Sequence, residues 1–170
     1  TTNQNELRYT SLEKLNERVV NRINFFFDDI LSKDKSVIFL GEDIISPYGG
    51  AFKVANNLSL KYPNNVISTP ISEQAITGLS NGLAIKGFRP YLEIMFGDFI
   101  TLSMDQIINH ASKFYHMYNK KVHCPIVIRT PMGGGRGYGP THSQTLDRML
   151  AGINNITLVA LNSFIDPFVI

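Results

Sequence analysis

The sequence has almost no cysteine, and this narrows the kinds of protein that it can encode. Its 170 residues include one cysteine, Cys124, which has no second cysteine to pair with. A disulfide framework is therefore excluded. The expected location is a reducing compartment, which is the cytoplasm, or an organelle matrix if the source is eukaryotic.

Long apolar runs and clustered positive charge are missing as well. No apolar stretch approaches the 18 residues of a membrane span, and the N-terminus has no signal-peptide pattern, so we expect no membrane association. The formal net charge is +2, with lysine and arginine scattered along the chain, which predicts no nucleic-acid partner. The glycine-rich stretch 133–139 lacks both the dinucleotide-binding fingerprint and a Gly-Lys-Ser/Thr ending, which excludes a Rossmann-type nucleotide site.

What the chain does contain is an alternation of apolar runs and amphipathic stretches. At 170 residues and 44% hydrophobic content, one domain can bury roughly 70% of its unfolded surface. Strands alternating with helices predict an α/β fold with a three-layer architecture, a parallel β-sheet with helices on both faces. The expected strands are 37–40, 66–69, an apolar run within 89–99, 125–129 and 156–160. The expected helices are 10–32, 51–62, one that Ser72 caps and that runs to about residue 87, one from Asp98 or Thr101 to about residue 118, and 143–152.

The stretch from Val66 to Phe99 contains the strongest local signals. Pro70 disfavours helical geometry at Thr69, so the β-branched run ends there. Ser72 can cap the following helix, which places Glu73 in its first turn, beyond the carboxyl end of a strand, where parallel sheets bind ligands. The alternative is that Glu73 only favours the positive end of the helix dipole.

Small residues line one face of that predicted helix. Ala75, Gly78, Gly82 and Ala84 leave the face nearly bare. Such a face predicts the close approach of a neighbouring backbone or of a helix from a partner chain.

Several ordered motifs resemble the pyrimidine-binding domain of thiamine-diphosphate enzymes. They are, in chain order, Gly41-Glu42-Asp43, Gly49-Gly50-Ala51-Phe52, Thr69-Pro70-Ile71-Ser72-Glu73, Arg129-Thr130-Pro131 and His142-Ser143-Gln144. The resemblance is closest to the β-subunit of the decarboxylating component of 2-oxoacid dehydrogenases, the group that handles pyruvate, branched-chain oxoacids and acetoin. It covers about residues 9–161 and implies the thiamine-diphosphate-binding fold.

The resemblance implies catalytic roles for two residues. Glu73 matches the glutamate that hydrogen-bonds a ring nitrogen of the aminopyrimidine and promotes the imino tautomer that deprotonates the thiazolium carbon. A carboxyl shielded from water suits that proton exchange, because desolvation raises its pKa. His142 matches a histidine on the substrate side that assists proton transfer and acyl handover. His110, His116 and His123 lack such a setting, and we interpret them as surface or packing residues.

Four further residues match positions that contact the cofactor. Phe99 matches the aromatic that stacks on the pyrimidine ring, with Ile71 and Met95 as its flanking neighbours; the alternative is that all three are ordinary core. Glu42 matches an acid directed towards the cofactor, or is a solvated loop acid. The loop 133–139 matches a segment that shapes the substrate entrance.

The sequence lacks the Gly-Asp-Gly segment through which thiamine-diphosphate enzymes hold the diphosphate; Gly97-Asp98-Phe99 is its nearest match. The resemblance therefore implies that the chain has no metal ligands of its own and that an α-type partner holds Mg²⁺ and the diphosphate. Thiamine diphosphate would lie between the two chains, and alone the chain would be inactive. Further implied partners are a second β-subunit in an α2β2 assembly, a lipoyl acyltransferase and a 2-oxoacid substrate.

The resulting hypothesis is a β-type subunit that decarboxylates a 2-oxoacid and passes the acyl group to lipoyl. The alternatives are a non-catalytic α/β interaction module and a transketolase-like enzyme half with a different acceptor. The predicted organisation is a frayed segment at 1–9, a pyrimidine-binding domain at 10–161, and the start of a linker to a C-terminal domain at 162–170.

Overall fold

A four-stranded parallel sheet organises the computed structural model, which describes residues 16–170. Its strands are β1 (Val37–Gly41), β2 (Val66–Ser68), β3 (Arg89–Glu93) and β4 (Val127–Arg129), in the order β2-β1-β3-β4. All neighbouring pairs are parallel. The predicted α/β fold with a parallel sheet is confirmed.

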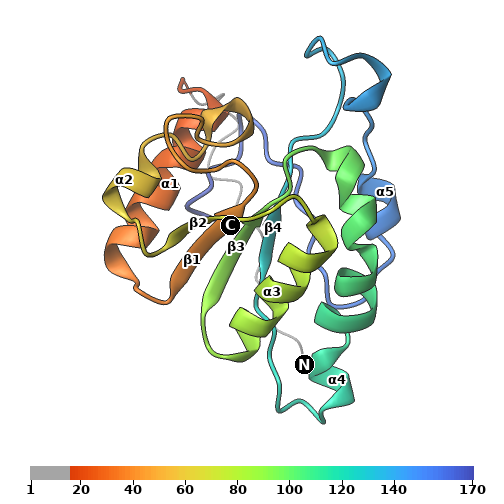
Figure 1. The fold of residues 1–170 in the computed structure, drawn as a ribbon. Helices are drawn as coiled ribbons and strands as arrows, with labels where there is room; N and C mark the ends of the chain where they lie inside the picture. The colour runs from red at the N-terminus through yellow and green to blue at the C-terminus, as the bar shows by residue number, and fades with distance from the viewer. Residues whose placement is uncertain (1–15) are drawn as a thin grey trace.

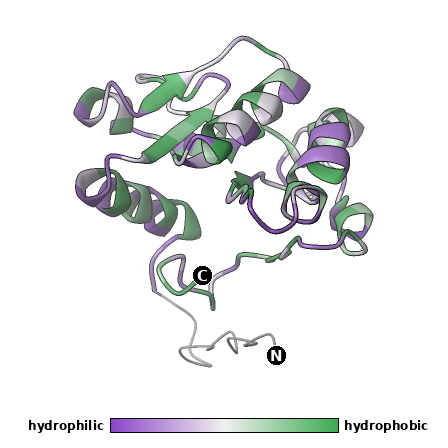
Figure 2. Ribbon diagram, turned by 90° about the horizontal axis from the view of Figure 1, so that it is seen from below, coloured by the Kyte–Doolittle hydropathy of each residue, from purple (hydrophilic) through white to green (hydrophobic). Residues whose placement is uncertain are grey.

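Helices cover both faces of the sheet (Figure 1). One face carries α1 (Val19–Lys33) and α2 (Leu58–Lys61). The other carries α3 (Glu73–Ile85), the 3₁₀ helix η2 (Gly97–Ser103), the π-helix η3 (Gln106–Ala111) and α4 (Phe114–Met117). The short helices η1 (Ala51–Lys53), η4 (Gly139–Thr141) and α5 (Asp147–Leu150) lie in the connections. Figure 2 shows the largely hydrophobic strands between the two helical layers.

Strand β1 is buried on both faces and separates two hydrophobic cores. Val37 and Phe39 pack with α1, where the rings of Phe27 and Phe39 stack with centroids 4.1 Å apart. Ile38 and Leu40 pack on the opposite side, against Ile76 of α3 and Leu92 of β3. Successive side chains of a strand point to opposite faces, so a strand covered on both sides reads as a continuous apolar run.

Helix α3 begins as the sequence predicts. The Ser72 hydroxyl accepts a hydrogen bond from the Ala75 amide at 3.4 Å, and Glu73 lies in the first turn. A Cβ atom on Gly78 would lie 3.2 Å from Gln106 Oε1, so this part of the small-residue face packs against η3 of the same chain. Gly82 has no neighbour within 4 Å and lies on an open surface.

The predicted helix 51–62 is wrong. Phe52, Lys53 and Asn57 have positive φ angles, which a helix does not allow, and only η1 and α2 form. The Asn24 side chain of α1 donates to the carbonyls of Val54 and Asn56 and so holds the irregular backbone. Ala55 and Leu58 are buried as expected, whereas Phe52 is 41% exposed rather than inward.

The predicted strand 156–160 is also wrong, because this segment forms no strand in the structure. Asn155 has φ +61° and donates from its side chain to the Ser112 carbonyl at 2.8 Å, so the chain turns towards the helical layer. Ile156 then packs with Ile100 and Ile107 instead of pairing with β4.

Three other helices differ from their predicted limits. The expected helix 98–118 is divided into η2, η3 and α4, and the expected helix 143–152 is reduced to α5. Helix α1 begins at Val19 rather than at residue 10, since residues 16–18 are not helical; the rest of the predicted start, and the frayed segment 1–9, lie outside the described residues. No helix in residues 16–170 is long and apolar enough to cross a membrane.

Strands β1 and β3 lie close together at Gly41, and a pair of glycine substitutions tests this packing. A Cβ on Gly41 would lie 2.8 Å from the backbone oxygen of Glu93, so we expect Gly41→Ala to lower the free energy of unfolding by about 1–3 kcal/mol. Gly82→Ala places a methyl group on an open helix surface and should raise the free energy of unfolding by about 0.5–1 kcal/mol. Urea denaturation of both variants measures the difference. Equal stability of the two would contradict the packing at Gly41.

Candidate active site

The carboxyl ends of the four strands meet at one edge of the sheet, and the candidate residues gather there. β1 leads into Glu42, β2 into Thr69, β3 ends at Glu93, and β4 leads into Thr130. The chain places β2 on one side of β1 and β3 on the other, so the strand order reverses between β1 and β3. In open parallel sheets, ligands bind at the carboxyl edge at such a switch point.

Unpartnered polar atoms concentrate at this edge. Among the described residues, five buried side-chain oxygens have no hydrogen-bond partner: Glu42 Oε1, Thr69 Oγ1, Glu93 Oε1, Asp98 Oδ2 and Thr130 Oγ1. All five belong to the ends of strands or to the helix η2 that follows β3. Buried polar groups without partners are rare in folded proteins, so this cluster indicates a site completed by groups from outside the chain.

Glu42 and Glu73 form a buried acidic pair. Glu42 is 5% exposed and Glu73 is 6% exposed. Burial raises the pKa of the Glu42 carboxyl, and the charge of Glu73 raises that pKa further, while the Ser72 backbone N–H opposes the shift. The structure therefore brings together two acids that lie 31 positions apart in the sequence, and it rules out a solvated loop position for Glu42.

Two hydroxyl groups hold the backbone at Glu73. Thr77 Oγ1 donates to the Glu73 carbonyl at 2.7 Å and lies 2.8 Å from Ser103 Oγ, which itself donates to the same carbonyl at 3.0 Å. Both side chains are fully buried. Neither residue was assigned to the site from the sequence: the position of Thr77 one helical turn after Glu73 was the only local signal, and nothing in the sequence links it to Ser103.

The rings of Phe99 and His142 lie in contact, as parts of a larger aromatic cluster. The His142 ring is 4.5 Å from the Phe96 ring and 5.3 Å from the Phe99 ring, both in edge-to-face geometry. Tyr138 and Phe52 complete the cluster, with ring centroids 5.1 Å and 6.2 Å from that of Phe96. Phe99 and His142 were expected at the site; Phe52 and Tyr138 were not assigned to it from the sequence.

The two remaining candidates differ in exposure. Met95 is half-buried between β3 and η2. Ile71, in the turn before α3, is 79% exposed, so the alternative of an ordinary core residue is wrong for Ile71. Phe99 is partly buried, and its ring packs against the hydrophobic core beside α3.

A buried ion pair, which was not predicted from the sequence, lies at the same edge. The Arg129 guanidinium donates to a Glu93 carboxylate oxygen, and Glu93 is 1% exposed. Burial raises the pKa of Glu93, and Arg129 opposes this rise. Gly50 covers the carboxyl with φ +75°, where a Cβ would lie 2.7 Å from Glu93 Oε1. Only glycine fits this position without displacing the acid.

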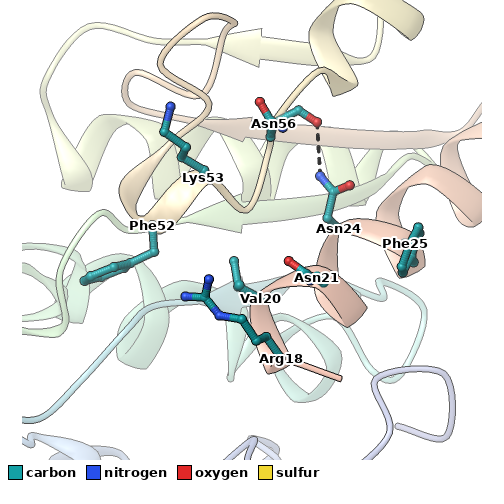
Figure 3. Close-up of a pocket in the computed structure, with 8 residues that line it drawn as sticks. All are labelled: Arg18, Val20, Asn21, Asn24, Phe25, Phe52, Lys53 and Asn56. Atoms are coloured by element: carbon teal, nitrogen blue, oxygen red, sulfur yellow. Dashed lines mark hydrogen bonds between the residues drawn. The ribbon is translucent and has the colours of Figure 1, made fainter. Parts of the chain in front are cut away.

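A cavity of about 550 Å³ lies beside this edge rather than on it (Figure 3). It is lined by Arg18, by residues of α1 and by residues of the 52–56 loop. Of the aromatic cluster it includes only Phe52. In the part of the chain that the structure describes, no three His, Cys, Asp or Glu residues are grouped so that they could hold a metal ion.

Comparison with known proteins connects this arrangement to named relatives. The chain is 37% identical over 146 residues to the acetoin:2,6-dichlorophenolindophenol oxidoreductase subunit beta of Cupriavidus necator. The aligned region covers 81% of this chain and 43% of the relative. It is 36% identical over 141 residues to the 2-oxoisovalerate dehydrogenase subunit beta of Bacillus subtilis, covering 82% and 43%. It is 39% identical over 137 residues to the human mitochondrial pyruvate dehydrogenase E1 component subunit beta, covering 80% and 38%.

The chain spans less than half the length of these curated relatives. The matched part is the one that contains the sheet and its carboxyl edge. Residues 20–164 match the family described as "Transketolase, pyrimidine binding domain", which is most of the chain. The chain therefore belongs to the transketolase pyrimidine-binding domain family.

Proposed function

We propose that this chain is the pyrimidine-binding part of a β-type subunit of a thiamine-diphosphate-dependent 2-oxoacid dehydrogenase. The observation that carries the proposal is the buried pair of Glu42 and Glu73 at the carboxyl edge. The names of the relatives specify acetoin, 2-oxoisovalerate and pyruvate. For this chain we propose decarboxylation of a 2-oxoacid with transfer of the acyl group to lipoyl.

The residues at the edge fit the pyrimidine half of the cofactor. A buried carboxyl at Glu73 offers a hydrogen bond to a ring nitrogen, and Phe99 offers an aromatic face beside it. Ile71 and Met95 supply apolar surface, and the unpartnered Glu42 Oε1 offers a further acceptor. When bound, thiamine diphosphate supplies a carbon nucleophile and an electron sink for decarboxylation.

The carboxyls of this chain would hold and exchange the protons that the reaction needs. Thr77 and Ser103 anchor the backbone of Glu73, from which its buried carboxyl extends. Glu42 has a raised pKa, and it can therefore retain a proton nearer neutrality than an exposed glutamate. His142, at the opposite side of the aromatic cluster, would move a proton on the substrate side.

The proposal assigns the rest of the site to other chains. An α-type partner would hold the diphosphate and Mg²⁺, a second β-subunit would complete an α2β2 assembly, and a lipoyl acyltransferase would receive the acyl group. The exposed Ile71 and the open Gly82 surface support a covered face on this side of α3. The proposed location is the cytoplasm, or an organelle matrix if the source is eukaryotic.

The first test replaces the acid at the start of α3. In the complex with its α-type partner, we expect Glu73→Gln to abolish hydrogen–deuterium exchange at the thiazolium carbon, because the amide cannot exchange the proton of the carboxyl. Glu17→Gln, at an exposed position, is the matched control and should exchange as the wild type does. NMR of quenched samples measures the exchange. Wild-type exchange in Glu73→Gln would remove Glu73 from the mechanism.

The second test concerns the histidine in the aromatic cluster. Loss of a positioned acid or base costs about 10²–10⁴-fold in turnover, so we expect that loss in His142→Ala, with cofactor affinity within a few-fold of the wild type. His123→Ala changes an exposed histidine and should keep full turnover. Steady-state assays with a panel of 2-oxoacids give both the effect and the substrate. Normal turnover of His142→Ala would mean that the ring is only structural.

The third test uses the chain without any partner. One hydrogen bond and one aromatic stack contribute about 2–3 kcal/mol, and immobilising the ligand offsets most of this. We therefore expect titration calorimetry with Mg²⁺ and thiamine diphosphate to detect no binding tighter than about millimolar. Micromolar binding to the isolated chain would show that the site is complete without a second subunit.

A further inference from the structure

The imidazole of His142 has a hydrogen-bonded neighbour that defines where its proton lies. His142 Nδ1 is 2.7 Å from the hydroxyl oxygen of Thr141. The same hydroxyl donates to the carbonyl oxygen of Tyr138 at 3.1 Å. A hydroxyl has one hydrogen to give, and a carbonyl oxygen can only accept, so both contacts are hydrogen bonds only if the hydroxyl gives its hydrogen to the carbonyl. Its oxygen is then an acceptor for the ring, so Nδ1 carries the hydrogen of the neutral imidazole.

The opposite tautomer, with the hydrogen on Nε2, leaves fewer hydrogen bonds at the Thr141 hydroxyl. If the Thr141 hydroxyl donated to Nδ1, the Tyr138 carbonyl would lose its donor from Thr141 and one of the two hydrogen bonds would disappear. The arrangement with Nδ1–H keeps both. It leaves Nε2 with a free lone pair, and Nε2 makes no hydrogen bond to any residue that the structure describes. The hydrogen bond at one ring nitrogen thus determines the chemistry of the other.

The loop that contains these residues is held in place by one arginine. Arg136 donates through Nε to the Gly133 carbonyl at 2.9 Å and through Nη2 to the His142 carbonyl at 3.0 Å. Its guanidinium also lies over the rings of Phe52 and Phe96, 5.2 Å and 5.9 Å from their centroids. Because the donors of a guanidinium form a rigid fork, these contacts fix the backbone of His142 relative to the aromatic cluster.

We propose that Thr141 is a positioning residue that sets His142 in the Nδ1–H tautomer and presents Nε2 as the proton acceptor, with Arg136 holding the loop. This inference rests on the proposed function, in which His142 moves a proton. It adds the identity of the reacting nitrogen and the residue that selects it.

The test compares two substitutions of Thr141 with a matched control. Thr141→Val removes the hydroxyl but keeps the branched shape, Thr141→Ser keeps the hydroxyl, and Thr157→Val makes the same change at an exposed threonine. Nitrogen-15 NMR of the imidazole in the full chain distinguishes a protonated from an unprotonated ring nitrogen. We expect Nδ1 to be protonated in the wild type, in Thr141→Ser and in Thr157→Val, and the tautomer to shift towards Nε2–H in Thr141→Val.

Kinetics of the complex with its α-type partner supply the second readout. A wrong tautomer removes the acceptor from the reacting position, so kcat of Thr141→Val should fall about 10- to 100-fold, with KM within about two-fold and recovery in Thr141→Ser. A wild-type ring protonated at Nε2, or the same tautomer in wild type and Thr141→Val, would overturn the inference. The expected NMR shift with unchanged kcat would instead count against the proposed role of His142, so the two failures are distinguishable.

Discussion

The pairing of β1 with β3 is the interaction on which the candidate site depends. Gly41 pairs with Glu93 across these strands, and a Cβ on Gly41 would lie 2.8 Å from the Glu93 carbonyl oxygen. This close approach brings the loop after β1 over the end of β3, where Gly50 covers the Glu93 carboxyl. Because β1 is buried on both faces, the groups at its end are withdrawn from water as well.

Burying the carboxyls of Glu42, Glu73, Glu93 and Asp98 at one edge has an energetic cost that the fold offsets only in part. Glu93 is paired with Arg129, while the Glu42 pKa is raised by burial and by the neighbouring Glu73. Burying a charge without a partner is costly, so a domain selected for stability alone would replace such residues with apolar ones. Groups with perturbed pKa values in one place are typical of a functional site, and here they coincide with the unpartnered oxygens of the strand ends.

The sequence predicted the parts of the fold whose signals are local. The Thr69-Pro70 break and the Ser72 cap lie within a few residues of the elements that they delimit, and both β2 and α3 form there. The helix 51–62 and the strand 156–160 were wrong because distant side chains decide those segments, Asn24 in the first case and the contact of Asn155 with Ser112 in the second. Local propensity gives no account of such contacts.

The same distinction applies to the site. Glu42, Glu73, Phe99 and His142 could be placed at one edge from the order of the motifs and the geometry of parallel strands. The Glu93–Arg129 pair joins residues 36 positions apart, and the Thr77–Ser103 contact joins residues 26 apart, so neither could be found without the structure. These pairs contribute the rigidity of the site, whereas the residues found from the sequence contribute its proposed chemistry.

The open surface next to the acids indicates why the domain would need a second chain. Ile71, two residues before the buried Glu73, is 79% exposed, and Leu79 is 50% exposed on the helix that Glu73 begins. Glu42 and Glu73 are already buried within the chain, and burial raises the pKa of Glu42. A surface that covered the exposed apolar side chains beside them would enlarge the low-dielectric region around both acids. In the proposed assembly, the surface that a partner would cover lies next to the acids, so assembly and proton exchange would be coupled at this edge.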